Sequence, residues 1–172
     1  KIMGKIALRF SKLILGLFFY ALGIVLTIQA NISYGPWEVF HVGLSAVTGL
    51  SIGGASIIVG LIIVVITVLM GERIGIGTLL NMLLIGFFLD LLLAIGLIPR
   101  IENTLVGIIV LIIGLYVISL GSYFYIGSGV GAGPRDSLMV ALPRKLRWPI
   151  GLIRSLIELK AKILGRRLGG MV

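Results

Sequence analysis

The chain has 172 residues, of which 59% are hydrophobic and 12% charged, and it carries a formal net charge of +9. A soluble domain has about 25% charged residues, so this chain lacks the polar side chains that would cover a water-facing surface. Its apolar residues also form runs of about 20, the length of helix that crosses a bilayer. The composition excludes a soluble domain and predicts an all-α protein that spans the bilayer several times.

Residues that hold metals or disulfides are scarce. The chain has no cysteine and one histidine. This excludes disulfides, thiolate metal sites and cysteine nucleophiles, and it argues against a His/Cys metal site. Nothing in the sequence calls for a cofactor.

The basic residues gather at the ends of the apolar runs. Four precede the first run and nine lie between Arg135 and Arg167, whereas residues 13–72 contain none. This distribution is typical of membrane orientation and not of nucleic-acid binding. We therefore expect the bilayer as a partner, no nucleic-acid partner, and a cytoplasmic N-terminus in the cell membrane.

In chain order, the sequence predicts four spans with a short helix after the first and after the fourth. The spans are expected at residues 13–30, 51–70, 78–98 and 104–126, and the short helices at 36–48 and 134–147. Each short helix follows a Gly-Pro pair, because proline suits the first helical turn. Both are too short to cross a bilayer, so each either re-enters the membrane or lies at its surface. A last segment begins at Pro149.

An internal repeat links the two Gly-Pro pairs. They are 98 residues apart (133 − 35 = 98), and an ungapped alignment at this offset matches further residues. The matches include Gly16 with Gly114, Gly23 with Gly121, Gly71 with Gly169, and Glu38 with Asp136. The first copy, residues 1–98, holds three spans, so the second copy, residues 99–172, should be inverted in the membrane. Residues 31–50 contain no Lys or Arg and residues 128–148 contain four, which agrees with that inversion.

The second copy is incomplete. It stops at Val172, before any counterpart of the third span, so we expect the native chain to carry a sixth span. Its last segment also departs from the repeat, because four basic residues align with apolar residues of the first copy. They are Lys160, Lys162, Arg166 and Arg167. A basic residue at the bilayer centre costs about 2.5–3.5 kcal/mol, so residues 160–167 are not expected to form a fifth span.

Three motifs carry a family resemblance. They are QANISYGPWE at residues 29–38, GIGTLLN at residues 75–81 with Gly86 and Asp90 beyond it, and GVGAGPRD at residues 129–136. On these motifs, and over nearly its whole length, the chain resembles the YczE/YyaS/YitT-type bacterial integral membrane proteins. The resemblance implies a protein of the cytoplasmic membrane and brings no catalytic residues.

Each Gly-Pro segment places a helix N-terminus after a flexible break. The free N–H groups and the helix dipole give such an end a partial positive charge, and in inverted-repeat transporters similar ends bind anionic groups. This predicts a substrate site lined by Tyr34, Gly35, Trp37, Gly133 and Arg135. The alternative is a pair of tight turns that hold interfacial helices.

Three carboxylates are further candidates. Glu38 and Asp136 both stand at the third helical position, where they either cap a helix or couple solute movement to protons. Asp90 lies inside the third expected span, so it is either a buried proton carrier or an acid near the outer interface.

Several other polar residues have structural interpretations. Asn81 should form a hydrogen bond between helices, and Arg154 should pair with Glu158 one turn away. His41 is expected on the wet face of its short helix, and Tyr125 in an aromatic belt at the membrane interface.

Together these features favour a secondary transporter or exporter of a small solute, with anionic solutes among the candidates. The alternative is a membrane scaffold that supports a partner enzyme, because the spans contain few ionisable residues. An enzyme is not expected, since the chain has no Ser/His pair, no HExxH motif and no phosphate-binding glycine loop in context. The sequence leaves open whether the chain forms a homo-oligomer.

Overall fold

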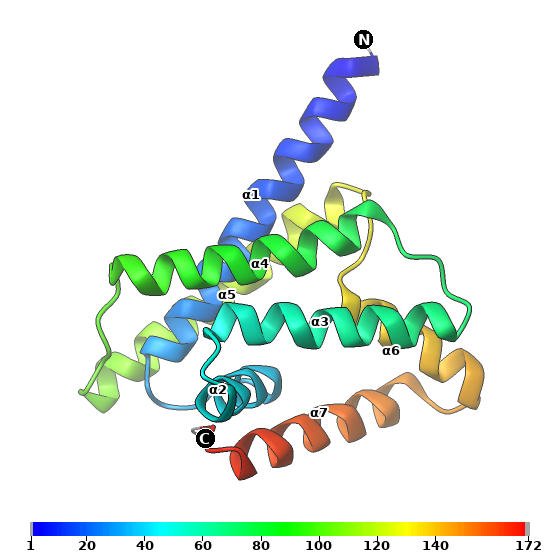
Figure 1. Ribbon diagram of the computed structural model, residues 1–172. Coiled ribbons are helices and arrows are strands. Elements are labelled where there is room, and N and C mark those ends of the chain that lie inside the picture. Colours follow the sequence, from blue (N-terminus) through cyan, green and yellow to red (C-terminus); the bar gives the residue numbers. More distant parts are fainter. Residues whose placement is uncertain (1, 171–172) are drawn as a thin grey trace.

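The computed structural model describes residues 2–170, except for the side chains of residues 2, 3 and 5. Within this range the secondary structure is entirely helical (Figure 1). The helices are α1 (Ile2–Gln29), α2 (Pro36–Thr48), α3 (Ile52–Leu69), α4 (Ile76–Ile95), α5 (Thr104–Gly127), α6 (Pro134–Leu146) and α7 (Ile150–Arg167). Lys1 and the outer bounds of the two expected copies, residues 1 and 172, lie outside the described residues.

Four helices are long and apolar enough to cross a membrane, which confirms the predicted all-α, multi-span class. They are Ile6–Gln29 within α1, and α3, α4 and α5. Residues 2–170 contain no fifth helix of this kind, so α7 does not qualify. The helix extends well before the predicted start of the first span at residue 13, since α1 begins at Ile2. The basic and apolar residues before Leu13 are mostly good helix formers, and extending an existing helix is easy.

Both short helices form as the Gly-Pro pairs predict. Gly35 and Gly133 have extended backbones, with φ of −60° and −65°, and each precedes a proline at the first helical position. α2 ends at a left-handed Gly49, and α6 ends at a left-handed Arg147. α6 therefore stops one residue before the predicted boundary, because Arg147 leaves the helical conformation.

Helices α1 and α5 pack against each other in antiparallel directions, with glycines at the contact. A Cβ atom added to Gly16 would lie 2.8 Å from the Gly121 carbonyl oxygen, and one added to Gly121 would lie 2.7 Å from that of Gly16. Gly23 and Gly114 form a similar pair, at 2.8 and 3.1 Å. The two backbones approach this closely because none of these residues has a side chain.

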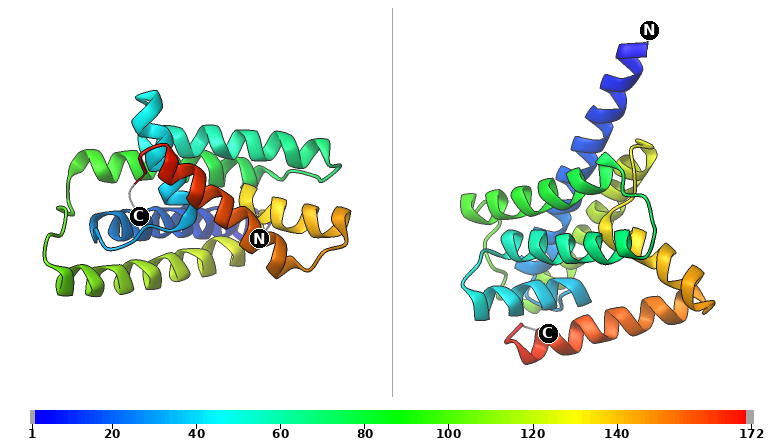
Figure 2. Two further views of the ribbon diagram at one scale, coloured as in Figure 1. Left: turned by 90° about the horizontal axis from the view of Figure 1, so that it is seen from below. Right: turned by 45° about the vertical axis from the view of Figure 1, so that its right-hand side comes forward.

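The offset of 98 residues also relates helix boundaries. Adding 98 to the bounds of α2, 36 and 48, gives those of α6, 134 and 146, and adding it to those of α3, 52 and 69, gives those of α7, 150 and 167. Left-handed residues follow the same offset, namely Asn31 and Gly129, Gly49 and Arg147, and Gly71 and Gly169. Packing is reciprocal too, since α2 packs on α7 and α3 packs on α6 (Figure 2).

The hydrophobic core centres on α1. Leu13, Leu17 and Val25 are almost fully buried, and they pack in one cluster with Ile85 and Leu89 of α4. Outward-facing residues of the spans are mostly large and apolar, as in α5, where only 17% of the most apolar window is buried. Such a surface fits a lipid environment, where exposed apolar side chains have no cost.

Candidate functional site

The N-termini of α2 and α6 meet through Arg135. Its guanidinium carbon lies 4.8 Å from the ring centroid of Trp37, a cation–π contact. One guanidinium nitrogen is 3.6 Å from the Glu38 carboxylate, and the other is 3.4 Å from Nε2 of His41. All three partners belong to α2, so one side chain of α6 joins the first turns of both short helices.

His41 is buried, which shows that its expected place on a wet face is wrong. Only 3% of the residue is exposed. Burial, and secondarily the positive charge of Arg135, hold the pKa of His41 well below its ordinary value of 6.5. The imidazole is therefore neutral at neutral pH, and a neutral ring can accept a hydrogen bond from Arg135. Sequence reasoning missed this contact because it joins helices 94 residues apart.

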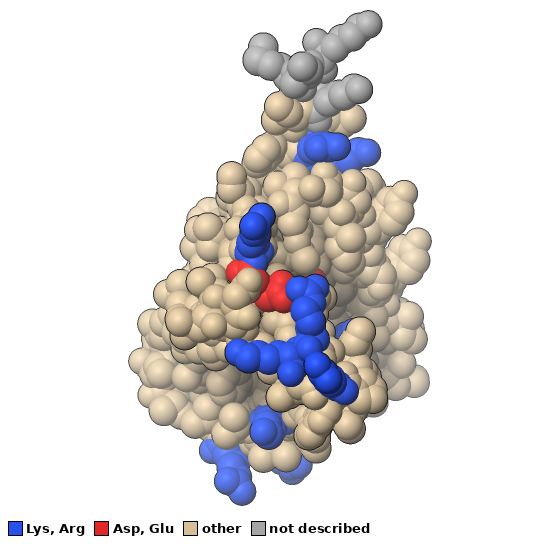
Figure 3. All heavy atoms as spheres, turned by 90° about the vertical axis from the view of Figure 1, so that its right-hand side faces the viewer, with Lys and Arg blue, Asp and Glu red and all other residues tan. Residues whose placement is uncertain are grey.

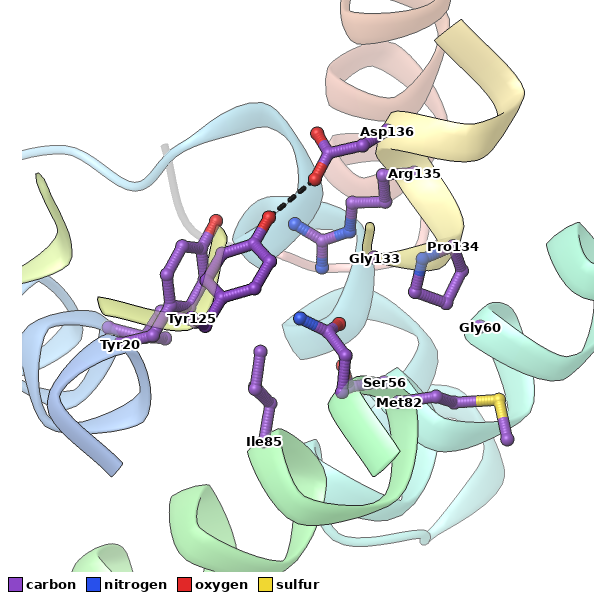
Figure 4. Close-up of a pocket in the computed structure, with 12 residues that line it drawn as sticks. Tyr20, Ser56, Gly60, Met82, Ile85, Tyr125, Gly133, Pro134, Arg135 and Asp136 are labelled. Atoms are coloured by element: carbon purple, nitrogen blue, oxygen red, sulfur yellow. Dashed lines mark hydrogen bonds between the residues drawn. The ribbon is translucent and has the colours of Figure 1, made fainter. Parts of the chain in front are cut away.

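A cavity of about 70 Å³ lies beside Arg135 (Figure 4). Five helices supply its walls. The lining residues are Tyr20 and Ile24 of α1, Ser56 and Gly60 of α3, Asn81, Met82 and Ile85 of α4, Tyr125 of α5, Pro134, Arg135 and Asp136 of α6, and Gly133 just before α6. The N-terminus of α6 therefore forms one wall of the cavity.

Two tyrosines form the opposite wall. The Tyr125 hydroxyl donates a hydrogen bond of 2.5 Å to the Asp136 carboxylate (Figure 4). Its ring meets that of Tyr20 edge to face, with centroids 6.0 Å apart. Tyr125 is only 4% exposed, so its expected place in an interfacial belt is wrong. Asp136 is exposed, and Figure 3 shows acidic side chains surrounded by basic ones on the end of the molecule that carries α6.

Asn81 faces the cavity from α4 and is 8% exposed. Among the described residues its amide has no hydrogen-bond partner, so the expected bond between helices is wrong. The amide lies against Gly133 instead, since a Cβ added there would be 3.0 Å from Asn81 Oδ1 and 3.3 Å from Nδ2. Thr78, one turn earlier, fixes the same loop by donating to the Ala132 carbonyl at 2.6 Å.

The structure brings together five of the eight predicted site residues. These are Trp37, Glu38, Gly133, Arg135 and Asp136. Tyr34 is instead buried in the core cluster, 9% exposed, and Gly35 lies beneath the Glu38 carboxylate, where a Cβ would collide. Asn81 also lines the cavity but was not among the predicted site residues. The sequence could have indicated it, because a lone amide in an apolar span needs a polar neighbour.

Asp90 lies apart from the cavity. Its carboxylate accepts hydrogen bonds from the Ser51 hydroxyl at 2.6 Å and from the Gly53 backbone N–H at 2.7 Å. Ser51 is the N-cap of α3. Asp90 therefore fixes the start of α3, where a negative charge also suits the helix dipole.

No cluster of three or more His, Cys, Asp or Glu side chains that could hold a metal ion occurs in the described part of the chain. The polar groups around the cavity are hydroxyls, an amide, a carboxylate, a guanidinium and backbone N–H groups. This set can bind a small polar solute by hydrogen bonds and charge.

The fold and its apolar helices define a multi-pass α-helical membrane protein. The family can also be stated. Residues 7–167 match the family of unknown function DUF6198, and the chain belongs to that family.

Its relatives are described as membrane proteins or simply as uncharacterised. The chain is 36% identical over 170 residues to the uncharacterised membrane protein YczE of Bacillus subtilis, covering 98% of this chain and 78% of the relative. It is 30% identical over 162 residues to an uncharacterised protein of Haemophilus influenzae, covering 94% and 73%. Identity to YyaS of B. subtilis is 27% over 146 residues, covering 83% and 72%. These matches confirm the expected family, and no solved structure matches at a significant level.

Proposed function

We propose that the protein is a secondary transporter or exporter in the cell membrane, and that its solute is small and carries an anionic group. One observation carries the proposal: Arg135 joins the first turns of the two short helices, and the first turn of α6 lines a cavity. Broken helices whose N-termini face a central site are a recurring plan of secondary transporters. The N-terminus of α6 supplies N–H groups and partial positive charge there.

The proposal includes an inverted repeat whose halves are related by a pseudo-two-fold axis. Under such an axis, a contact between residues i and j + 98 requires a second contact between j and i + 98. Gly16 meets Gly121, which is 23 + 98, and Gly23 meets Gly114, which is 16 + 98. Trp37 meets Arg135, which is its own counterpart at 37 + 98, so this pair would lie on the axis. The reciprocal packing of α2 on α7 and of α3 on α6 supports the same plan.

The membrane orientation can be tested by cysteine labelling, because the natural chain has no cysteine. Ser33 and Ala132 are exposed and lie just before the two Gly-Pro pairs. With a cytoplasmic N-terminus, a membrane-impermeant thiol reagent should label Ser33→Cys in intact cells and Ala132→Cys only in inverted vesicles. Labelling of both residues from the same side would contradict the inverted repeat.

Transport itself is tested by flux into proteoliposomes across a panel of small solutes, with imposed ion gradients. We expect gradient-dependent flux of at least one solute, and its loss in Arg135→Ala. Arg144→Gln is a matched control, because Arg144 is exposed and pairs with Glu72 at 2.9 Å, outside the cavity. Absence of flux for every solute would reject the transporter, and a scaffold for a partner enzyme would then be the better explanation.

A further inference from the structure

We propose that the cavity binds a monovalent oxyanion of about three or four heavy atoms, such as formate or nitrate, between the N-terminus of α6 and Asn81. This inference rests on the proposed function and names its substrate class.

The first turn of α6 provides free donors. Gly133 caps this 13-residue helix without a side-chain hydrogen bond, and Pro134 has no N–H. The backbone N–H groups of Arg135 and Asp136 therefore have no partner within the helix. All four residues line the cavity. An anion there would accept bonds from this turn, as anions do at other helix N-termini.

Asn81 is an independent indication of a ligand. The residue is more than nine-tenths buried and lines the cavity, and its amide has no partner among residues 2–170. Its nitrogen and oxygen stay accessible from the cavity, since no fully buried side-chain N or O atom among the described residues lacks a partner. Polar groups in such a pocket are normally satisfied by water or a ligand. Because the amide lies against Gly133, its nitrogen can donate to the same ligand as the first turn of α6.

The size of the cavity limits the ligand. At about 70 Å³ it has roughly half the volume of the engineered 150 Å³ cavity that binds benzene. The pocket is only partly enclosed, so an aromatic acid or a sugar would extend beyond the walls that surround the anionic group. A planar anion of about four heavy atoms would fit, and its oxygens could reach both donors.

The charges around the cavity limit the charge of the ligand. Arg135 lines the cavity and has Glu38 at 3.6 Å, and the neighbouring Asp136 carboxylate accepts a hydrogen bond from Tyr125. Arg154 is paired with Glu158 and contributes no surplus charge. The helix end adds a partial positive charge, equivalent to about half an elementary charge. Because the carboxylates of Glu38 and Asp136 lie close by, a divalent anion is disfavoured more than a monovalent one.

Binding can be followed through Trp37, because this ring stacks on Arg135 at the edge of the site. The chain has two tryptophans, so Trp148→Phe leaves Trp37 as the sole emitter. We would titrate the purified full-length protein in detergent with sodium formate at constant ionic strength, and compare sodium benzoate and sodium sulfate. The expected result is a saturable fluorescence change with formate and none with benzoate or sulfate.

Two variants and one control test the site. Asn81→Ala removes the amide, and Gly133→Ala places a methyl group against it, so each should weaken formate binding about tenfold or more. Gly127→Ala should bind formate normally, because nothing lies within 4 Å of its Cβ position. Each variant must elute as a single species in size-exclusion chromatography, and Asn81→Gln serves as a second, milder variant if Asn81→Ala fails to fold.

The outcomes separate this inference from the proposed function. If formate and nitrate give no saturable change while another solute shows flux, the substrate class is wrong and the transporter stands. If formate saturates and no solute shows flux, the binding site stands and the transporter is wrong. Equal affinity in the parent protein, Asn81→Ala and Gly133→Ala would place any binding elsewhere and overturn the inference.

Discussion

Trp37 and Arg135 occupy the same position in two different helices and contact each other. Each follows a Gly-Pro pair as the second residue of a short helix, and the guanidinium carbon lies 4.8 Å from the indole centroid. A cation–π contact contributes about 0.5–1 kcal/mol at exposed sites and about 2 kcal/mol or more when it is desolvated. The pair thus joins the two helix starts beside the cavity.

Arg135 and Glu38 should be energetically coupled. Their side chains are 27% and 14% exposed, so Arg135→Ala leaves a largely buried carboxylate without its cation. We expect this variant to lower the thermal unfolding midpoint in detergent by several degrees. Adding Glu38→Gln should recover part of the loss. Additive losses in the double variant would show that the two groups do not interact.

The glycine contacts between α1 and α5 should not tolerate a methyl group. A Cβ at Gly121 would lie 2.5 Å from the Tyr20 backbone nitrogen, and helix backbone cannot move aside as a flexible side chain can. We expect Gly16→Ala and Gly121→Ala each to destabilise the protein by about 1–3 kcal/mol. Thermal unfolding of purified protein measures the loss. Gly127→Ala is the control, and an equal loss there would mean that only the helix backbone, and not the contact, matters.

Stability should fall with acidification because of His41. Its pKa is lowered in the folded protein, so below pH 6.5 the unfolded chain takes up a proton that the folded chain does not. The stabilising contribution is complete above pH 6.5 and decreases as the pH falls from there toward the folded-state pKa. Unfolding midpoints measured from pH 7.5 downward should show this slope in the parent protein and a smaller slope in His41→Gln. An identical slope in both would assign the acid sensitivity to other groups.

Asp90 should matter for folding more than for solute binding. Its carboxylate accepts two hydrogen bonds at the start of α3, and bonds to a charged group each contribute about 1.5–3 kcal/mol. We expect Asp90→Ala to lower the unfolding midpoint clearly and Asp90→Asn to lower it less. The affinity of the folded fraction for its solute should stay unchanged in Asp90→Asn. A loss of affinity in a variant of normal stability would instead show that Asp90 takes part in solute binding.

The local features of the fold could be predicted because local rules govern them. Proline fixes φ, and glycine permits left-handed turns, so the Gly-Pro pairs located the starts of α2 and α6 to the residue. The apolar runs located the spans, with errors of a few residues at ends such as Ile76, where the sequence changes polarity gradually. The pairing of Arg154 with Glu158, at 2.8 Å, is confirmed, because the two residues lie one helical turn apart.

The contacts of the site could be predicted only in part. Trp37, Glu38 and Arg135 stand next to the Gly-Pro pairs, so a rule about helix ends found them. Tyr20 and His41 could not be found in this way. Whether Tyr20 lines the cavity and His41 contacts Arg135 depends on which helices pack together and at which level along their axes.

The sequence by itself determined that the chain is a helical membrane protein, where its two short helices begin, and that both are too short to span. These properties depend on hydrophobicity and backbone preference, which act over a few neighbouring residues. Only the tertiary structure decided that Arg135 reaches α2, that Tyr125 donates to Asp136, and that Asn81 faces a cavity with no partner in the described part of the chain. These contacts join residues far apart in the chain, so they depend on how closely the glycine-lined helices approach and not on any local pattern.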